Sequence, residues 1–176
     1  MKYLILTEGY SELGLIDVLL EKKMLIYDLE NLVYEQAHHG RQIDDVIKEK
    51  INSLPYNEKV AVVRIGDKLS DTIKIPKELK GKIIQEIKVC TKPEFEILHI
   101  IHRKKFKEYL SVKTEMKPCE FLRTLDKRYT KSYKYNYDYF NNLTRIELID
   151  LLKEYSIKRG KTHNPDEKKI YELLKN

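Results

Sequence analysis

The first acidic residue of the chain, Glu8, stands where a side chain could do chemistry. It follows the apolar run YLILT at 3–7 and precedes Gly9. Such a run is typical of a buried strand, and glycine permits the tight turn that would follow it. In parallel α/β sheets, ligands bind at the edge where the strands end. A carboxylate there could hold a hard cation such as Mg²⁺ or transfer a proton. It could also be an exposed strand-end acid or a cap of the next helix.

A second polar group follows the apolar run at 60–63. Arg64 and Asp67 come directly after this run, and Asp71 lies four residues further on. Arg64 and Asp67 could contact a phosphate, or form an ion pair that closes the loop. Arg41 is another candidate phosphate ligand, since guanidinium can donate two parallel hydrogen bonds to phosphate.

Glu96 is the third candidate acid. Pro93 is typical of the first turn of a helix, which we expect to run to about Leu110. Apolar residues surround Glu96 on almost every side, which predicts that it is buried. A buried carboxylate needs a partner or a function, and a helix N-terminus favours negative charge. Glu96 is therefore predicted as a supporting catalytic acid. His102 faces another way, and we expect it to be a half-buried, hydrogen-bonded histidine.

The segment 127–140, KRYTKSYKYNYDYF, combines cationic side chains with five tyrosines. Proteins that bind single-stranded nucleic acid use this combination, because cations hold the backbone and rings stack on bases. The candidate nucleic-acid-binding residues are Lys127, Arg128, Lys131 and Lys134, together with Arg41 and Arg64. The alternation of tyrosines over 133–139 equally fits a half-buried strand or a surface ribbon.

These residues must be positioned by alternating strands and helices. The expected strands lie at 3–7, 24–27, 60–63 and 87–89, and the expected helices at 11–20, 42–53, 93–110, 144–156 and 165–175. Such alternation predicts an α/β fold with a mainly parallel sheet flanked by helices. We expect one domain over 1–176, with a core at about 1–112 and a helical C-terminal layer at about 113–176. His38 and His39 fall in the polar stretch EQAHHGRQ, where an exposed loop is expected.

The overall composition limits the classes of protein to consider. The 176 residues suit one domain with a hydrophobic core, and the net charge of +6 is compatible with a polyanionic partner. No apolar run approaches the roughly 18 residues that cross a bilayer, so no membrane association is expected. Cys90 and Cys119 stand far apart without a metal-binding motif, as thiols do in a reducing compartment. A cytoplasmic location is therefore expected.

Two motifs resemble a known family. The order of a strand, Glu8, Gly9, two residues, Glu12 and a helix is similar to the opening of the TOPRIM domain of primases, topoisomerases and overcoming-lysogenization-defect nucleases. The segment TKPEFEILHIIH resembles the Pro-x-Phe-Glu-aliphatic…His signature of RloB-like proteins, a TOPRIM-related group found with bacterial restriction loci. The matching positions are Pro93, Phe95, Glu96 and His102. The segments YTKSY and NPDEKKIYELL resemble the tail of that family more weakly.

This resemblance implies a TOPRIM-like sheet and a nuclease or phosphotransfer activity on nucleic acid, in phage defence or a mobile element. It implies that Mg²⁺ or Mn²⁺ is held by Glu8 and by an Asp-x-Asp motif after a later strand. The chain departs from the family here, because RIGDKLSD offers only Asp67 and, further on, Asp71 for this motif. The resemblance therefore implies Asp67 and Asp71 as the candidate metal ligands beside Glu8. Two alternatives follow from the departure. The chain could be a catalytically inactive TOPRIM-like module that binds nucleic acid or nucleotides, or a protein–protein adaptor beside an ATPase.

Overall fold

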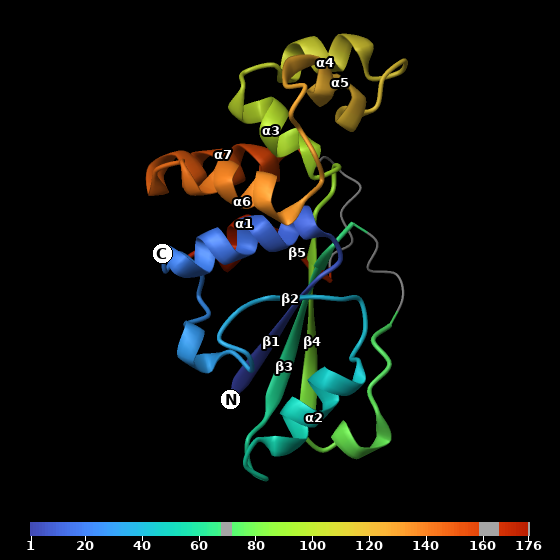
Figure 1. Ribbon diagram of the computed structural model, residues 1–176, viewed down its shortest axis with the longest axis vertical. Coiled ribbons are helices and arrows are strands. Elements are labelled where there is room, and N and C mark those ends of the chain that lie inside the picture. Colours follow the sequence, from blue (N-terminus) through green and yellow to red (C-terminus); the bar gives the residue numbers. More distant parts are fainter. Residues whose placement is uncertain (68–71, 159–165, 176) are drawn as a thin grey trace.

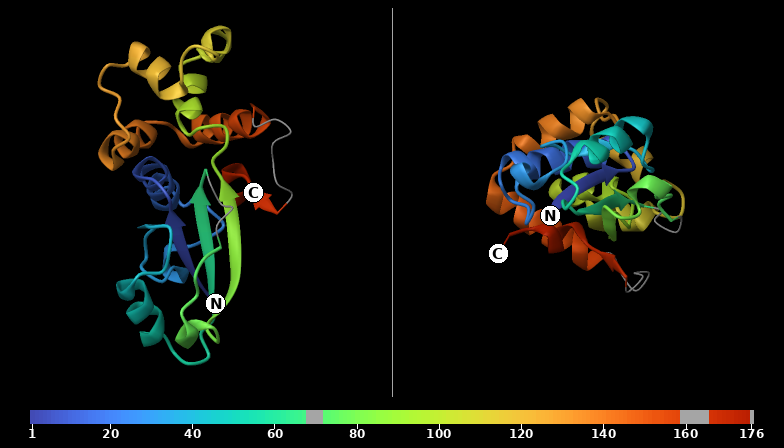
Figure 2. Two further views of the ribbon diagram at one scale, coloured as in Figure 1. Left: turned by 90° about the vertical axis from the view of Figure 1, so that its right-hand side faces the viewer. Right: turned by 90° about the horizontal axis from the view of Figure 1, so that it is seen from below.

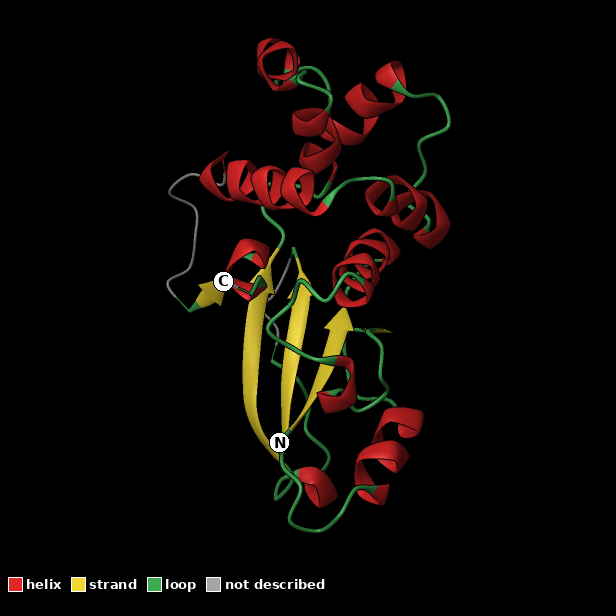
Figure 3. Ribbon diagram, turned by 90° about the vertical axis from the view of Figure 1, so that its left-hand side faces the viewer, coloured by secondary structure: helices red, strands yellow, loops and turns green. Residues whose placement is uncertain are grey.

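The computed structural model describes residues 1–67, 72–158 and 166–175. Within these residues the fold is α/β, built on a five-stranded, all-parallel sheet (Figures 1 and 3). The strand order across the sheet is β2-β1-β3-β4-β5. The strands are β1 (Lys2–Thr7), β2 (His38–His39), β3 (Val60–Gly66), β4 (Ile83–Cys90) and β5 (Glu167–Lys168). The predicted fold class is thus confirmed, with a parallel sheet and a helical C-terminal region.

Helices cover both faces of the sheet. The α-helices are α1 (Tyr10–Glu21), α2 (Asp45–Ser53), α3 (Glu96–His102), α4 (Phe106–Val112), α5 (Pro118–Leu125), α6 (Tyr133–Asn141) and α7 (Arg145–Lys158). Three 3-10 turns add η1 (Leu29–Asn31), η2 (Lys77–Leu79) and η3 (Ile170–Leu173). Helix α2 packs on one face of the sheet and α1 on the other (Figure 1).

Two apolar layers result, because successive side chains of a strand point to opposite faces. In β1 and β3, Leu4 and Val62 pack toward α2, whereas Ile5 and Val63 pack toward α1. All four side chains are almost completely buried. The layer on the α1 side is the larger one, since it continues through α3 to α7. This alternation fixes the register of β1 and therefore the direction in which Glu8 leaves it.

The helical C-terminal region lies beyond the carboxyl edge of the sheet (Figures 1 and 2). Helices α3, α4 and α5 extend furthest from the sheet, while α6 lies along α1. The chain then returns through β5, which pairs in parallel with β4, with Lys88 opposite Glu167 (Figure 2). Loops and helix starts from this region therefore face the ends of β1 and β3.

The second strand was predicted in the wrong place. Residues 24–27 form no strand, although Leu25 makes an isolated antiparallel bridge to Leu174. Met24, Leu25 and Tyr27 are buried in the core without forming a strand, and this burial explains the apolar run that suggested one. The edge strand is instead β2, where His38 and His39 pair with Leu6 and Thr7 of β1. A two-residue edge strand has no apolar periodicity to reveal it.

Two helix predictions need correction near the middle and end of the chain. The helix expected over 93–110 is two helices, α3 and α4, separated at Lys104, which has a φ of 60°. Pro93 precedes α3 by three residues instead of opening it. A helix was expected over 165–175, of which residue 165 lies outside the described residues, and residues 166–175 contain β5 and η3 instead. The predicted helices at 42–53 and 144–156 are confirmed as α2 and α7.

The start of α1 and the tyrosine-rich segment also differ from expectation. Gly9 occupies the N-cap of α1, so the helix begins at Tyr10, one residue before the expected start at residue 11. The tyrosines of 133–139 lie in helix α6, not in a strand or ribbon. Ser132 accepts a hydrogen bond from the backbone N–H of Tyr135 and so begins this helix. No helix among the described residues has the length and apolar character needed to cross a membrane.

Candidate functional site

A pocket of about 260 Å³ lies at the carboxyl edge of the sheet, where β1 and β3 end. Its walls come from the turn after β1, the start of α1, the segment after β2, the end of β3, the start of α3 and the loop before α6. The charged residues that line it are Glu8, Glu12, Arg41, Asp67, Glu94, Glu96 and Lys131. The three residues predicted as catalytic therefore line one pocket, although they come from three separate segments. Their catalytic role stays a prediction.

Glu8 is held between the two central strands. Its backbone N–H donates to the carbonyl of Ile65, which extends the pairing of β1 with β3 by one residue. A Cβ atom at Gly66 would lie 2.4 Å from Glu8 Oε2, so the missing side chain makes room for the carboxylate. Oε1 lies 2.6 Å from Nη2 of Arg41, whose side chain is 66% exposed. Glu8 is thus a mostly buried carboxylate with an exposed cation above it.

Glu12 is an acid that the sequence-based site prediction did not include. It lies in the first turn of α1, is 8% exposed, and accepts a long hydrogen bond of 3.4 Å from Thr91 Oγ1. Burial raises the pKa of Glu12 to about 7, and the nearby carboxylates of Asp67, Glu8 and Glu96 also raise it. The available signal was the place of Glu12 in the motif that begins with Glu8 and Gly9, in the first turn of a helix rich in apolar residues. This carboxyl group can gain or lose a proton near neutral pH.

Glu96 is buried, as the sequence predicted. It begins α3, is 3% exposed, and its Oε1 lies 2.6 Å from Nζ of Lys131. The Lys131 side chain is 62% exposed and comes from the loop before α6. Lys131 thus supplies the partner that a buried carboxylate needs. The pair also joins the helical C-terminal region to the pocket.

The six predicted nucleic-acid-binding residues divide into three sets. Arg41 and Lys131 line the pocket. Arg64 does not line it, because its guanidinium is buried in the sheet and pairs with Glu86 of β4 at 2.8 Å. The remaining cations are exposed on or near α6, where Arg128 pairs with Asp126 and Lys134 pairs with Asp138. Lys127 is exposed in the same loop as Arg128.

The predicted metal ligands are only partly placed. Glu8 and Asp67 line the pocket, whereas Asp71 lies outside the described residues. Within the described residues, no three His, Cys, Asp or Glu side chains are grouped closely enough to hold a metal ion as they lie. Arg41 and Lys131 instead neutralise two of the carboxylates. The donors have the chemistry that Mg²⁺ prefers, since carboxylate oxygens are its usual protein ligands.

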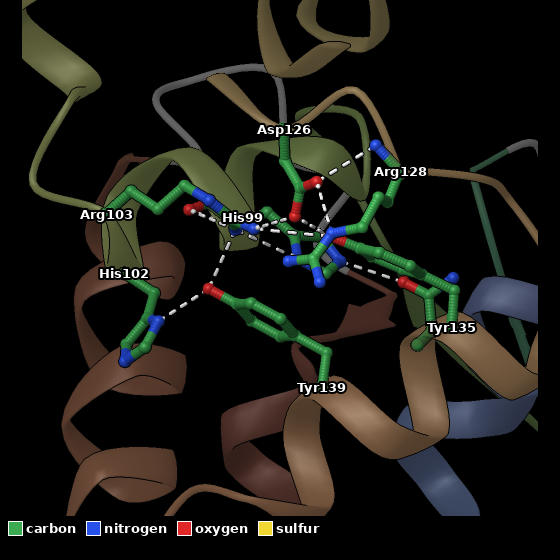
Figure 4. Close-up of polar contacts among 8 residues, drawn as sticks. His99, His102, Arg103, Asp126, Arg128, Tyr135 and Tyr139 are labelled. Carbon is green, nitrogen blue, oxygen red and sulfur yellow. Dashed lines mark hydrogen bonds and ion pairs between the residues drawn. The ribbon is translucent and has the colours of Figure 1, made fainter.

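The tyrosines of α6 are engaged within the protein (Figure 4). Tyr135 donates a hydrogen bond of 2.8 Å to Asp126, and Tyr139 accepts one of 2.8 Å from Arg103. His102 Nδ1 lies 2.6 Å from the hydroxyl of Tyr139, which confirms the prediction of a half-buried, hydrogen-bonded histidine. These contacts fix α6 against α3, so the rings serve packing and hydrogen bonding.

A buried polar chain connects this network to the pocket. His99 lies 2.8 Å from Asn136 Oδ1, and Asn136 Nδ2 donates to Ser11 Oγ at 3.2 Å and to the carbonyl of Ser132 at 2.8 Å. Burial lowers the pKa of His99 to about 3. His99 is therefore neutral and donates its Nε2 proton to the amide oxygen. Asn136 thereby ties the loop that carries Lys131 to the first turn of α1.

The chain was compared with protein-family models, with curated proteins and with solved structures, and no match was found in any of the three comparisons.

Proposed function

We propose that the pocket is a TOPRIM-like, metal-dependent site for phosphoryl transfer on nucleic acid, and that the protein is a nuclease. The proposal is supported by one observation above all. Glu8, Asp67 and Glu96 come from three segments and line the same pocket at the carboxyl edge of a parallel sheet. Ligands of parallel α/β proteins bind at this edge.

The charges of the pocket favour a bound cation. Among the described residues that line it, five carboxylates face two cations, Arg41 and Lys131. A phosphate would be repelled by this excess of negative charge unless a further positive charge accompanied it. Glu8 and Asp67 would hold Mg²⁺ or Mn²⁺, which supplies charge neutralisation and an activated water when bound.

The remaining residues have roles that follow from their positions. Arg41 and Lys131 would bind the phosphate backbone once they separate from Glu8 and Glu96. Glu12 would hold or release a proton, because its pKa of about 7 lies near the working pH. Before a phosphate binds, Glu96 would hold Lys131 at the pocket, since the two groups lie 2.6 Å apart.

A second candidate function is a catalytically inactive module that binds nucleic acid or nucleotides. The observation that favours it is the pairing of Arg41 with Glu8 and of Lys131 with Glu96. Two carboxylates are already neutralised by these pairs, and the described residues contain no ready group of three metal ligands. In this case the pocket cations would bind phosphate without any chemical step.

The decisive experiment is a cleavage assay on single- and double-stranded DNA and RNA, with Mg²⁺ or Mn²⁺ added. The nuclease proposal expects cleavage by the wild type, loss in Glu8→Gln, and no change in Glu115→Gln. Glu115 is an exposed glutamate that does not line the pocket, so it controls for the change of charge. Salt-sensitive binding without cleavage would favour the inactive module. A protein that neither binds nor cleaves nucleic acid, and that binds no nucleotide, contradicts both candidates.

A further inference from the structure

Two aromatic rings stack at the mouth of the pocket. The rings of Tyr10 and His39 have centroids 4.0 Å apart and planes only 7° from parallel. Tyr10 lines the pocket and is 53% exposed, and His39 is also exposed. A stacked pair with this much exposed aromatic surface is available to a further flat ring.

Backbone pairing between β1 and β2 brings the two segments that carry these rings together. Thr7 of β1 pairs with His39 of β2, and the N–H of Gly40 donates to the carbonyl of Thr7 at 3.0 Å. One backbone segment continues to Glu8 and Tyr10, and the other continues to Arg41. The short edge strand therefore places a phosphate-binding side chain and an aromatic platform next to each other.

Tyr10 differs from the tyrosines of α6. Tyr135 and Tyr139 have hydroxyl groups bonded to Asp126 and Arg103, and both rings pack in the helical region. Among the described residues, the Tyr10 hydroxyl makes no hydrogen bond, and the stack with His39 is the only ring contact of Tyr10. An exposed tyrosine can be an unremarkable surface residue. Its parallel stacking beside Arg41 and the pocket gives it a more specific use.

We propose that Tyr10 and His39 form a platform on which an unpaired nucleobase stacks while its phosphate lies at Arg41. This inference rests on the proposed function, and it specifies the substrate class as single-stranded nucleic acid. The faces of bases inside a duplex are covered by neighbouring base pairs, so a duplex offers the platform only its two end base pairs. Unpaired bases of any sequence can stack on an aromatic ring.

The test is fluorescence anisotropy of the full chain in Ca²⁺, an oxygen-binding cation that can neutralise the pocket carboxylates in place of Mg²⁺ or Mn²⁺, under conditions where no strand is cleaved, so that binding is measured apart from cleavage. The probes are short single-stranded DNA and RNA, the same strands in duplex form, and an abasic strand of equal length and charge. Tyr10→Ala should bind single strands about tenfold more weakly and leave abasic binding unchanged. Tyr10→Phe should bind like the wild type. Tyr56→Ala is the matched control, because Tyr56 is 95% exposed and lies outside the pocket.

The outcomes separate this inference from the nuclease proposal. Equal loss of base-containing and abasic binding in Tyr10→Ala overturns the platform, as does wild-type binding that ignores the presence of bases. Failure of the wild type to bind any single strand overturns it too. If Tyr10→Ala binds normally while Glu8-dependent cleavage persists, the platform is wrong and the nuclease stands. Base-dependent binding without cleavage in any metal leaves the platform and removes the nuclease.

Discussion

Gly66 lies so close to Glu8 that a methyl group on Gly66 would sit 2.4 Å from Glu8 Oε2 and 2.8 Å from its Cβ. Rotation of the Glu8 side chain could relieve the first contact but not the second, because Cβ is fixed by the backbone. Gly66, the last residue of β3, therefore helps to position the Glu8 carboxylate, although it has no side chain.

Gly66→Ala should displace Glu8 and abolish metal-dependent cleavage. The overpacking should also lower the free energy of unfolding by about 1–3 kcal/mol. Cleavage assays and urea denaturation measure the two effects. Gly81→Ala is the control, since no atom lies within 4 Å of the Cβ it would add. Full activity in Gly66→Ala would mean that the position of Glu8 is not critical.

Lys131 and Lys134 are exposed lysines three residues apart with different surroundings. Lys131 lines the pocket and pairs with Glu96, whereas Lys134 pairs with Asp138 on its own helix. Lys131→Gln should weaken nucleic-acid binding several-fold and reduce its salt dependence, and Lys134→Gln should have little effect. Binding at several salt concentrations measures this. Equal effects would indicate a diffuse basic surface instead of a pocket contact.

The sequence was sufficient to predict that Glu8, Asp67 and Glu96 lie together. Each follows or begins an element with a strong apolar pattern, and parallel strands bring their carboxyl ends to one edge. The burial of Glu96 followed from its apolar neighbours. These apolar patterns lie within short segments of the chain, so they can be recognised in a single sequence.

Other features depend on which segments become neighbours in space. Arg64 is buried beside Glu86 because β4 is the neighbour of β3 in the sheet. The residues around Arg64 do not reveal which strand lies next to β3. Lys131 reaches the pocket because α6 packs along α1, which no feature of the tyrosine-rich segment predicts. The strand at His38 and His39 exists only through its pairing with β1.

Glu12 should make the protein less stable as pH rises. Its pKa rises from 4.5 to about 7 on folding because of burial, so the folded state binds the proton more tightly. The stability that depends on this proton is complete below pH 4.5 and is lost as pH rises through about 7. The difference between the two pKa values corresponds to about 3 kcal/mol.

Glu12→Gln should therefore be more stable than the wild type at about pH 8 by up to about 3 kcal/mol, and nearly equal to it at about pH 4. Urea denaturation at both pH values is the measurement, and Glu115→Gln controls for loss of an exposed charge. A variant that gains nothing at the higher pH would show that Glu12 is charged without penalty in the folded protein.

His99 should act in the opposite direction. Burial lowers its pKa from 6.5 to about 3, so the folded state requires the neutral ring. Above pH 6.5 the ring is neutral in the unfolded state too, and folding then needs no loss of a proton. Stability is lost as pH falls from 6.5 toward 3, by about 2–3 kcal/mol between about pH 7 and 4.5. His99→Gln should be less stable than the wild type at neutral pH, because it loses ring packing, but the difference should narrow by this amount in acid. A constant difference would contradict the buried neutral histidine.

Gly14 tests the contact between α1 and α6 that brings the loop of Lys131 to the pocket. A Cβ atom at Gly14 would lie 2.8 Å from the backbone N of Tyr137 and 2.9 Å from the carbonyl O of Tyr133. Alanine is the better helix former by about 1 kcal/mol. However, backbone atoms cannot rotate away, and overpacking costs about 1–3 kcal/mol, so Gly14→Ala should destabilise the protein on balance. Urea denaturation measures this, with Gly81→Ala as control. A gain in stability would show that propensity outweighs the helix contact and that α6 can move away from α1 at little cost.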